Sequence, residues 1–212
     1  MIFIEKTEVG GWEAAIRGMR NPMNSWDKSD SLFWPGHMQI GKADLDLMKR
    51  LVASGTDHSK FMRFIIVTAD VTAPLYWWKE FETYKVGTVS NSCSTMHKIQ
   101  AKEFTLEDFS IEHLNDSGSL SNADNPVNAA EHILNCLNWY RKLYLESKDK
   151  KDWWQMIQLL PSSYNQKRTV LLNYAVLRNM YHARKNHKLD EWHQFCAWIE
   201  TLPFSELITM EV

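Results

Sequence analysis

Apolar residues recur at helical spacing in several stretches of the chain. Within 43–54, Leu45, Met48 and Val52 repeat every three or four positions, which predicts an amphipathic helix. A longer pattern opens at Pro126, a residue suited to the first turn, and continues to about residue 146. Similar patterns predict further helices over 12–20, 74–85, 151–159, 173–186 and 189–202.

Other stretches are rich in Ile, Val, Phe and Thr, or alternate loosely between apolar and polar residues, which is typical of strands. These predicted strands cover 1–8, 61–72 and 164–172. Segments rich in Ser, Asp, Asn, Gly or Pro are predicted loops over 23–40, 86–97 and 115–125. Helices gathered around a few strands indicate an α+β fold.

The composition is that of an ordinary globular protein. The 212 residues, of which 44% are hydrophobic and 24% charged, are enough to bury a sizeable core, and we expect one domain over 1–212. A net charge of −2 gives no basic bias toward nucleic acid or anionic membranes, and no apolar run reaches membrane-spanning length. The ten tryptophans indicate large aromatic packing surfaces, which can include subunit interfaces.

Common catalytic and metal-binding signatures are absent from the sequence, including the P-loop, the dinucleotide fingerprint, the nucleophile elbow and the zinc-protease helix. Three scattered cysteines favour a reducing, cytoplasmic location over a disulfide framework. His182, His187 and His193 match no helical ligand pair, so we expect no metal site. No base can be placed beside Cys93, which argues against a nucleophilic thiol.

The clearest chemical pattern follows the Leu-Pro that ends at Pro161. Asn173 lies 12 residues after this proline, and Arg184 lies 11 residues after Asn173. Asn173, Asn179 and Arg184 fall on one predicted helix, where about one and a half turns separate the last two and let both project toward a single pocket. The alternatives are that Asn173 is a helix N-cap and that Asn179 and Arg184 are surface residues.

This spacing resembles the nucleotide-site segment of the flavin-dependent thymidylate synthases, in which a Leu-Pro leads through a strand into a helix that touches flavin and deoxyuridylate. A second segment keeps the family order, with Gly55, a strand over 64–72 and Ala73-Pro74. Counted from this proline, the family's Arg-His-Arg-x-x-Ser falls on Thr83, Tyr84, Lys85, Val86, Gly87 and Thr88, and its Asn-Glu-x-Ser-x-Arg-Tyr falls on 91–97.

Several family residues are replaced in this chain. Lys85 keeps a cation and Thr88 keeps a hydroxyl, but Thr83 cannot supply a guanidinium fork for a planar anion. The later motif keeps its Asn and Ser and loses its acid, arginine and tyrosine. Two further family arginines are replaced by Ile157 and Ala175. The hydroxyls and backbone N–H groups of 90–95 suit phosphate without arginine, or form a simple polar loop.

The resemblance implies the fold of these synthases, with helices around a small mixed sheet, and a homotetramer with sites between subunits. It also implies reductive methylation of dUMP to dTMP, with methylenetetrahydrofolate as carbon donor and reduced FAD as hydride donor. The residues it assigns are Asn173, Asn179, Tyr84, Lys85 and Thr88 to FAD, Arg184 to the pyrimidine, Ser92, Ser94 and Thr95 to the phosphate, and Lys85 and Arg184 to catalysis. Two alternatives stay open: an enzyme that acts on another pyrimidine nucleotide, and a non-catalytic relative that binds nucleotide or assists assembly.

Overall fold

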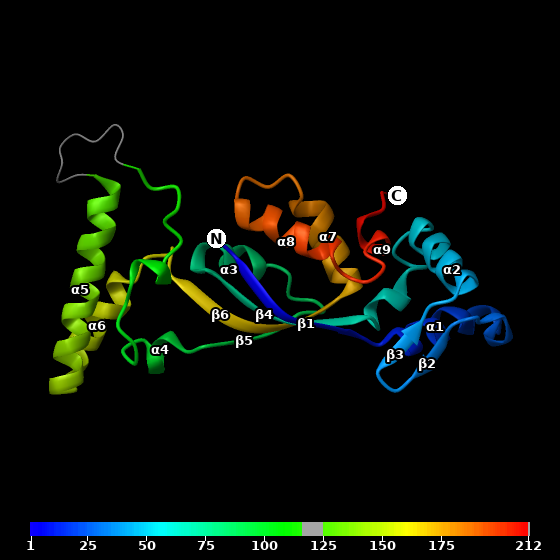
Figure 1. Cartoon of the computed structure of the whole chain (residues 1–212), viewed down its shortest axis with the longest axis horizontal. Helices are drawn as coiled ribbons and strands as arrows, with labels where there is room; N and C mark the ends of the chain where they lie inside the picture. Colours follow the sequence, from blue (N-terminus) through cyan, green and yellow to red (C-terminus); the bar gives the residue numbers. More distant parts are fainter. Residues whose placement is uncertain (116–124, 212) are drawn as a thin grey trace. The chain divides into compact units, whose positions relative to one another are not determined.

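Figure 1 shows the computed structural model of the chain, which describes residues 1–115 and 125–211. Helices and small sheets make up the fold, which confirms the α+β class. The loop predicted over 115–125 lies, apart from its two end residues, outside the described residues.

Four strands form one sheet in the order β1-β4-β6-β5. Their bounds are Phe3–Gly10 for β1, Ile66–Pro74 for β4, Asn165–Asn173 for β6 and Val89–Ser92 for β5. Leu75 N donates to Tyr164 O, and Tyr174 N donates to Ile65 O, each at 3.0 Å. Because these two bonds lie at opposite ends of β4 and β6, the strands run antiparallel. The sheets are antiparallel, which refines the expected small mixed sheet.

Contacts divide the chain into two compact units. The first unit comprises Met1–Phe3, Thr72–Phe81 and Asn91–Arg168, and the second comprises Ile4–Val71, Glu82–Ser90 and Thr169–Val212. Strands β4 and β6 each contribute residues to both units. A single domain over 1–212 stays a prediction.

The first unit contains both short and long helices. They are α3 (Leu75–Phe81), α4 (Thr95–Lys98), the 3-10 turn Leu106–Asp108, α5 (Pro126–Ser147) and α6 (Lys150–Leu159). Helices α5 and α6 lie side by side, and each begins with a side-chain cap, from Asn125 and Asp149 respectively. Their apolar faces bury Leu137 and Met156 in a core with Ile99, Phe104 and Phe109.

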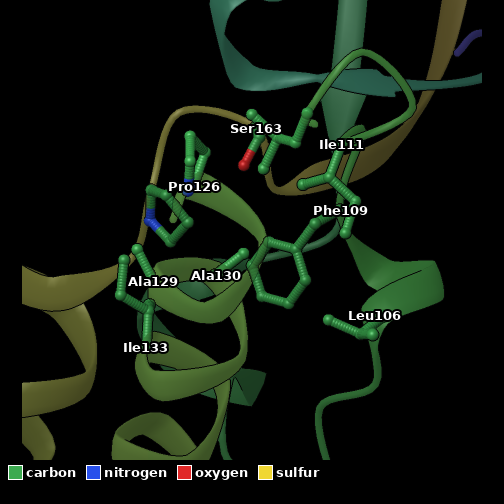
Figure 2. Close-up of a pocket in the computed structure, with 10 residues that line it drawn as sticks. Leu106, Phe109, Ile111, Pro126, Ala129, Ala130, Ile133 and Ser163 are labelled. Atoms are coloured by element: carbon green, nitrogen blue, oxygen red, sulfur yellow. The ribbon is translucent and has the colours of Figure 1, made fainter. Parts of the chain in front are cut away.

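An apolar cavity of about 270 Å³ lies beside the start of α5 in this unit. Figure 2 shows Ala129, Ala130 and Ile133 of α5 on one side of it and Leu106, Phe109 and Ile111 on the other. Among the described residues that line it, Ser163 is the one with a polar side chain. These residues offer no charged group for a nucleotide phosphate, and the candidate site lies elsewhere.

The second unit carries the remaining helices and a small hairpin. Its helices are α1 (Trp12–Arg20), α2 (Lys42–Ala53), α7 (Tyr174–Arg184), α8 (Asp190–Glu200) and α9 (Glu206–Thr209), with 3-10 turns at Asn21–Met23, Trp26–Lys28 and Lys60–Arg63. Strands β2 (Leu32–Trp34) and β3 (His37–Gln39) pair antiparallel. Trp12 packs edge-on against Tyr174 and Phe204, with ring centroids 5.3 and 5.2 Å away.

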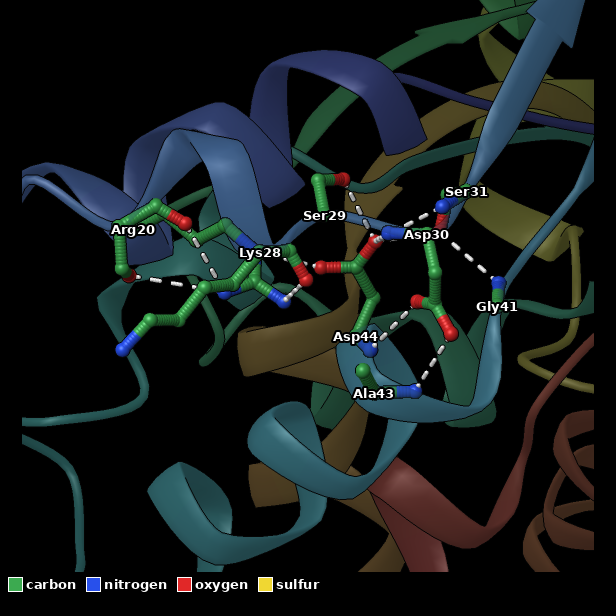
Figure 3. Close-up of polar contacts among 9 residues, drawn as sticks. Arg20, Lys28, Ser29, Asp30, Ser31, Gly41, Ala43 and Asp44 are labelled. Atoms are coloured by element: carbon green, nitrogen blue, oxygen red, sulfur yellow. Dashed lines mark hydrogen bonds and ion pairs between the residues drawn. The ribbon is translucent and has the colours of Figure 1, made fainter.

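A buried ion pair joins α1 to α2 (Figure 3). Arg20 Nε donates to Asp44 Oδ1 at 2.6 Å, and these side chains are 4% and 0% exposed. The other carboxylate oxygen accepts from the hydroxyls of Ser29 and Ser31, each at 2.7 Å, and from the backbone N–H groups of Asp30 and Ser31. Burial raises the pKa of Asp44, but hydrogen bonds from Ser31, Ser29 and Arg20 outweigh it and hold that pKa below its ordinary value.

The structure corrects several element boundaries. Pro74 ends β4 instead of starting the next helix, and α3 stops at Phe81 rather than near Lys85. The predicted loop over 86–97 contains β5 and α4, and the loop over 23–40 contains the β2–β3 hairpin. Strands of three or four residues are too short to show a clear alternation, and pairing with a partner strand decides them, so local sequence carries little signal for them. Along the described residues, no helix combines the length and apolar character needed to cross a bilayer.

Candidate functional site

Asn173 stands where β6 ends and α7 begins. Its Oδ1 accepts from Val176 N at 2.9 Å, so the N-cap interpretation is confirmed. Its amide nitrogen faces Gly87, where an added Cβ would lie 2.7 Å from Asn173 Nδ2. Gly87 also has a φ of 80°, a conformation that favours glycine. The segment around Gly87 therefore lies directly against the start of α7.

Arg184 ends α7 and contacts the same segment. Its Nε donates to the Tyr84 hydroxyl at 2.9 Å, and its guanidinium carbon lies 5.5 Å from the Tyr84 ring centroid. The Thr88 hydroxyl donates in turn to the Tyr84 carbonyl at 2.5 Å. Tyr84, Thr88, Asn173 and Arg184, which the sequence places in two segments about 90 residues apart, thus come together within the second unit.

Lys85 and Asn179 are not part of these contacts. Both side chains are exposed, whereas Arg184 is half-buried. The expectation that Asn179 and Arg184 project toward a single pocket is wrong: five residues correspond to about 140° around a helix, so the two side chains project from different sides of α7. Flavin binding by Lys85 and Asn179 accordingly stays a prediction that requires a ligand reaching solvent-facing side chains.

The candidate phosphate residues lie in the first unit, at the junction of β5 and α4. Ser92 ends β5, Ser94 caps α4 by accepting from His97 N at 3.1 Å, and Thr95 is the first residue of α4. The loop is fixed to β6 because Cys93 N donates to Lys167 O at 3.1 Å. Gln166 Nε2 also donates to Cys93 O, at 2.9 Å.

A polar cavity of about 170 Å³ adjoins this loop, and its lining includes two lysines that were not predicted from the sequence, Lys98 and Lys102. Lys102 Nζ is paired with Asp108 at 2.6 Å, whereas Lys98 has no ion-pair partner among the described residues. Lys98 is therefore the available cation of this cavity. No local sequence pattern identifies these two lysines, because the cavity forms only when α4 and the residues after it are packed.

Tyr164 also lines this cavity. Burial raises the pKa of Tyr164 to about 12, with smaller contributions from the neighbouring Cys93 and Asp108. Its hydroxyl can donate a hydrogen bond into the cavity. The remaining lining residues are Cys93, Ser94, Thr95, Ile99, Glu103, Phe104 and Asp108, the carboxylate that pairs with Lys102.

Arg168 is a further cation beside this loop that was not predicted from the sequence. Its guanidinium carbon lies 4.3 Å from the Trp78 ring centroid, and its Nε donates to Gln166 Oε1 at 3.0 Å. Because Gln166 also holds the Cys93 carbonyl, Arg168 supports the loop through a buried amide. No group of three or more potential metal-ligating side chains occurs among the residues that the structure describes.

No protein-family model and no curated protein matches the chain. Solved structures do match it. Thymidylate synthase X (ThyX) from Helicobacter pylori with FAD and dUMP has a TM-score of 0.69 at 18% identity, covering 99% of this chain and 98% of that chain. A second Helicobacter pylori flavin-dependent ThyX complexed with FAD and dUMP has a TM-score of 0.67 at 16% identity, covering 98% and 97%.

A UMP/dUMP methylase, PolB from Streptomyces cacaoi bound with 5-Br dUMP, matches with a TM-score of 0.62 at 14% identity, covering 99% of this chain and 94% of that chain. At these identities the likeness establishes the fold. The chain therefore has a ThyX-like fold over nearly its whole length, which confirms the fold that the two sequence segments predicted.

Proposed function

We propose that the chain is a flavin-dependent enzyme that methylates dUMP to dTMP, with methylenetetrahydrofolate as carbon donor and reduced FAD as reductant. The observation that carries the proposal is the contact of Tyr84 and Gly87 with Arg184 and Asn173, because it joins the two segments that resemble the synthase site. The fold, shared with proteins whose structures hold FAD and dUMP, supports it.

The side chains present suit both ligands. Flavin and pyrimidine rings carry carbonyl and ring-nitrogen groups that amides, hydroxyls and cations can bind. We assign FAD to Asn173, Asn179, Tyr84, Lys85 and Thr88, the pyrimidine to Arg184, and the phosphate to Ser92, Ser94, Thr95 and the newly found Lys98. FAD would supply the hydride when bound.

The protein's own part is orientation and electrostatics. Arg184 and Lys85 are the proposed catalytic residues, and their positive charge would stabilise negative charge that develops on the pyrimidine oxygen. The Ser94 hydroxyl oxygen accepts the N-cap hydrogen bond from His97 N. Its hydroxyl proton remains available to donate to a phosphate oxygen. We further propose that residues 1–212 act as one domain and assemble as a homotetramer.

A second candidate is methylation of another pyrimidine nucleotide, such as UMP. Thr83 and Met96 stand where the family has arginines, so this chain would hold its nucleotide differently. The matched methylase PolB is described as acting on UMP and dUMP. A non-catalytic nucleotide-binding or assembly role is the remaining alternative.

Release of tritium from carbon 5 of the pyrimidine distinguishes these candidates, since methylation at that carbon requires loss of its hydrogen. The protein would be incubated with FAD, a reductant and methylenetetrahydrofolate, together with 5-tritiated dUMP or 5-tritiated UMP. Release from dUMP supports the main proposal, and release from UMP alone supports the second. Flavin binding without release from either nucleotide would leave the non-catalytic role.

A further inference from the structure

The Arg184 side chain is held by two aromatic rings that we call the aromatic cradle, Tyr84 and Trp192. The guanidinium carbon lies 5.5 Å from the Tyr84 ring centroid and 5.1 Å from the Trp192 ring centroid. The two rings are 6.1 Å apart at an interplanar angle of 65°. Arginine is the cation best suited to such packing, because its planar group stacks on rings while its edge still donates hydrogen bonds.

Each ring of the cradle is fixed by its own surroundings. Trp192 is fully buried in α8 and packs edge-on against Phe195, with centroids 5.6 Å apart. The backbone of Tyr84 is held in place by a hydrogen bond that Thr88 Oγ1 donates to the Tyr84 carbonyl. The turn that carries Tyr84 is closed at Gly87, which leaves no room for a side chain over Asn173.

The hydrogen bond between Arg184 Nε and the Tyr84 hydroxyl adds direction to this packing. A ring contact restrains where the guanidinium lies, but it restrains rotation about the side-chain axis weakly. A bond at 2.9 Å from Nε sets that rotation and thereby the direction of the outer edge of the guanidinium. A preset donor edge avoids part of the ordering cost when a planar acceptor binds.

We propose that Tyr84 and Trp192 are positioning residues that set the orientation of the Arg184 guanidinium for a planar acceptor. The inference rests on the proposed function in taking the pyrimidine ring of the nucleotide as that acceptor. Tyr84 would thus act on the nucleotide indirectly, by orienting Arg184. Trp192, which was not among the residues predicted from the sequence, would have the same role.

A double-mutant cycle on dUMP affinity tests this role. Tyr84→Phe keeps the ring and removes the hydroxyl, and Arg184→Lys keeps the charge but cannot make the Nε contact. Calorimetry with dUMP and FAD-loaded protein should show a loss of about threefold to tenfold for Tyr84→Phe, the range of one hydrogen bond. In the Arg184→Lys background the same change should alter affinity by less than about twofold, the usual error of additivity. Equal losses in both backgrounds, or no loss in the first, would overturn the inference.

A second measurement does not depend on any nucleotide. In ¹⁵N spectra the Nε–H signal of Arg184 is identified by its disappearance in Arg184→Lys. It should shift in Tyr84→Phe and in Trp192→Phe and stay in place in Tyr181→Phe, a matched control on α7 whose hydroxyl bonds Glu200. An unshifted signal in Tyr84→Phe overturns the inference. A shifted signal in a protein that binds no dUMP supports the cradle and rejects the proposed function instead.

Discussion

Replacing Asp44 by asparagine should strongly destabilise the second unit. Asp44 is fully buried and accepts five hydrogen bonds, one from Arg20, two from hydroxyls and two from backbone N–H groups. Asparagine keeps the shape but has one acceptor oxygen and no charge, which leaves the buried Arg20 guanidinium uncompensated. Removing one partner of a buried pair costs about 3–5 kcal/mol, and we expect a loss of that size in the free energy of unfolding.

Urea denaturation of the parent and variant measures this loss. Asp46→Asn is the matched control, since Asp46 lies exposed on the same helix, and it should change stability by less than about 0.5 kcal/mol. A loss below about 1 kcal/mol for Asp44→Asn would mean that the Arg20–Asp44 pair contributes no more to stability than an exposed ion pair, and would refute the reasoning.

The same carboxylate predicts a pH dependence. The hydrogen bonds hold its folded pKa below the unfolded value of about 4, so its stabilising contribution is present above that pH. That contribution is lost as the pH falls through the folded pKa, because the folded state must then take up a proton. The acid limb of stability against pH should therefore be shallower in Asp44→Asn. If the stability of parent and variant fell equally steeply with decreasing pH, Asp44 would not be the source of the acid dependence.

The remaining predictions concern the proposed site. Arg184→Ala should weaken dUMP binding by about 1.5–3 kcal/mol, typical of a charged hydrogen bond, and calorimetry that shows equal affinity would return Arg184 to a surface role. Lys85→Ala should slow tritium release from 5-labelled dUMP by an amount worth up to a few kcal/mol, measured at saturating nucleotide, and an unchanged rate would remove Lys85 from catalysis. Lys98→Ala should weaken binding of dUMP about tenfold or more and leave deoxyuridine binding unchanged, whereas equal losses for both would rule out a phosphate contact. Light scattering at micromolar protein should give the mass of a homotetramer, and a monomer would contradict the assembly proposal.

Helices with clear apolar periodicity were predictable from the sequence. Residues 12–20 form a helix with the predicted bounds, and the long helix that begins at Pro126 ends within one residue of the prediction. Both have strong local signals, a period of 3.6 residues in the first and a capped proline start in the second. Strand β5 and the β2–β3 hairpin have no comparable pattern, because pairing with a partner strand decides them.

The candidate site was predictable in part. The Leu-Pro spacing located Asn173 and Arg184, and their N-cap and helix-end positions agree with it. The resemblance placed Tyr84 and Arg184 at one site, but the hydrogen bond between them was not predictable, because no local pattern links residues 100 positions apart. The packing of Trp192 on Arg184 was not predictable either, because it depends on how α8 packs against α7. Lys98 was missed for a similar reason, since its place in a cavity depends on how α4 packs.

The contact between Tyr84 and Arg184 also has a consequence for synthesis of the protein on the ribosome. Arg20 and Asp44 are 24 residues apart, so their pair can form as soon as α2 has emerged. The contact between Tyr84 and Arg184 can form only after 100 more residues have been synthesised, which takes about 5–20 s at ordinary rates of translation. During that interval the turn at residues 84–88 lacks its helix partner. The nascent chain should therefore gain protection around α1 and α2 well before its nucleotide site can bind a ligand.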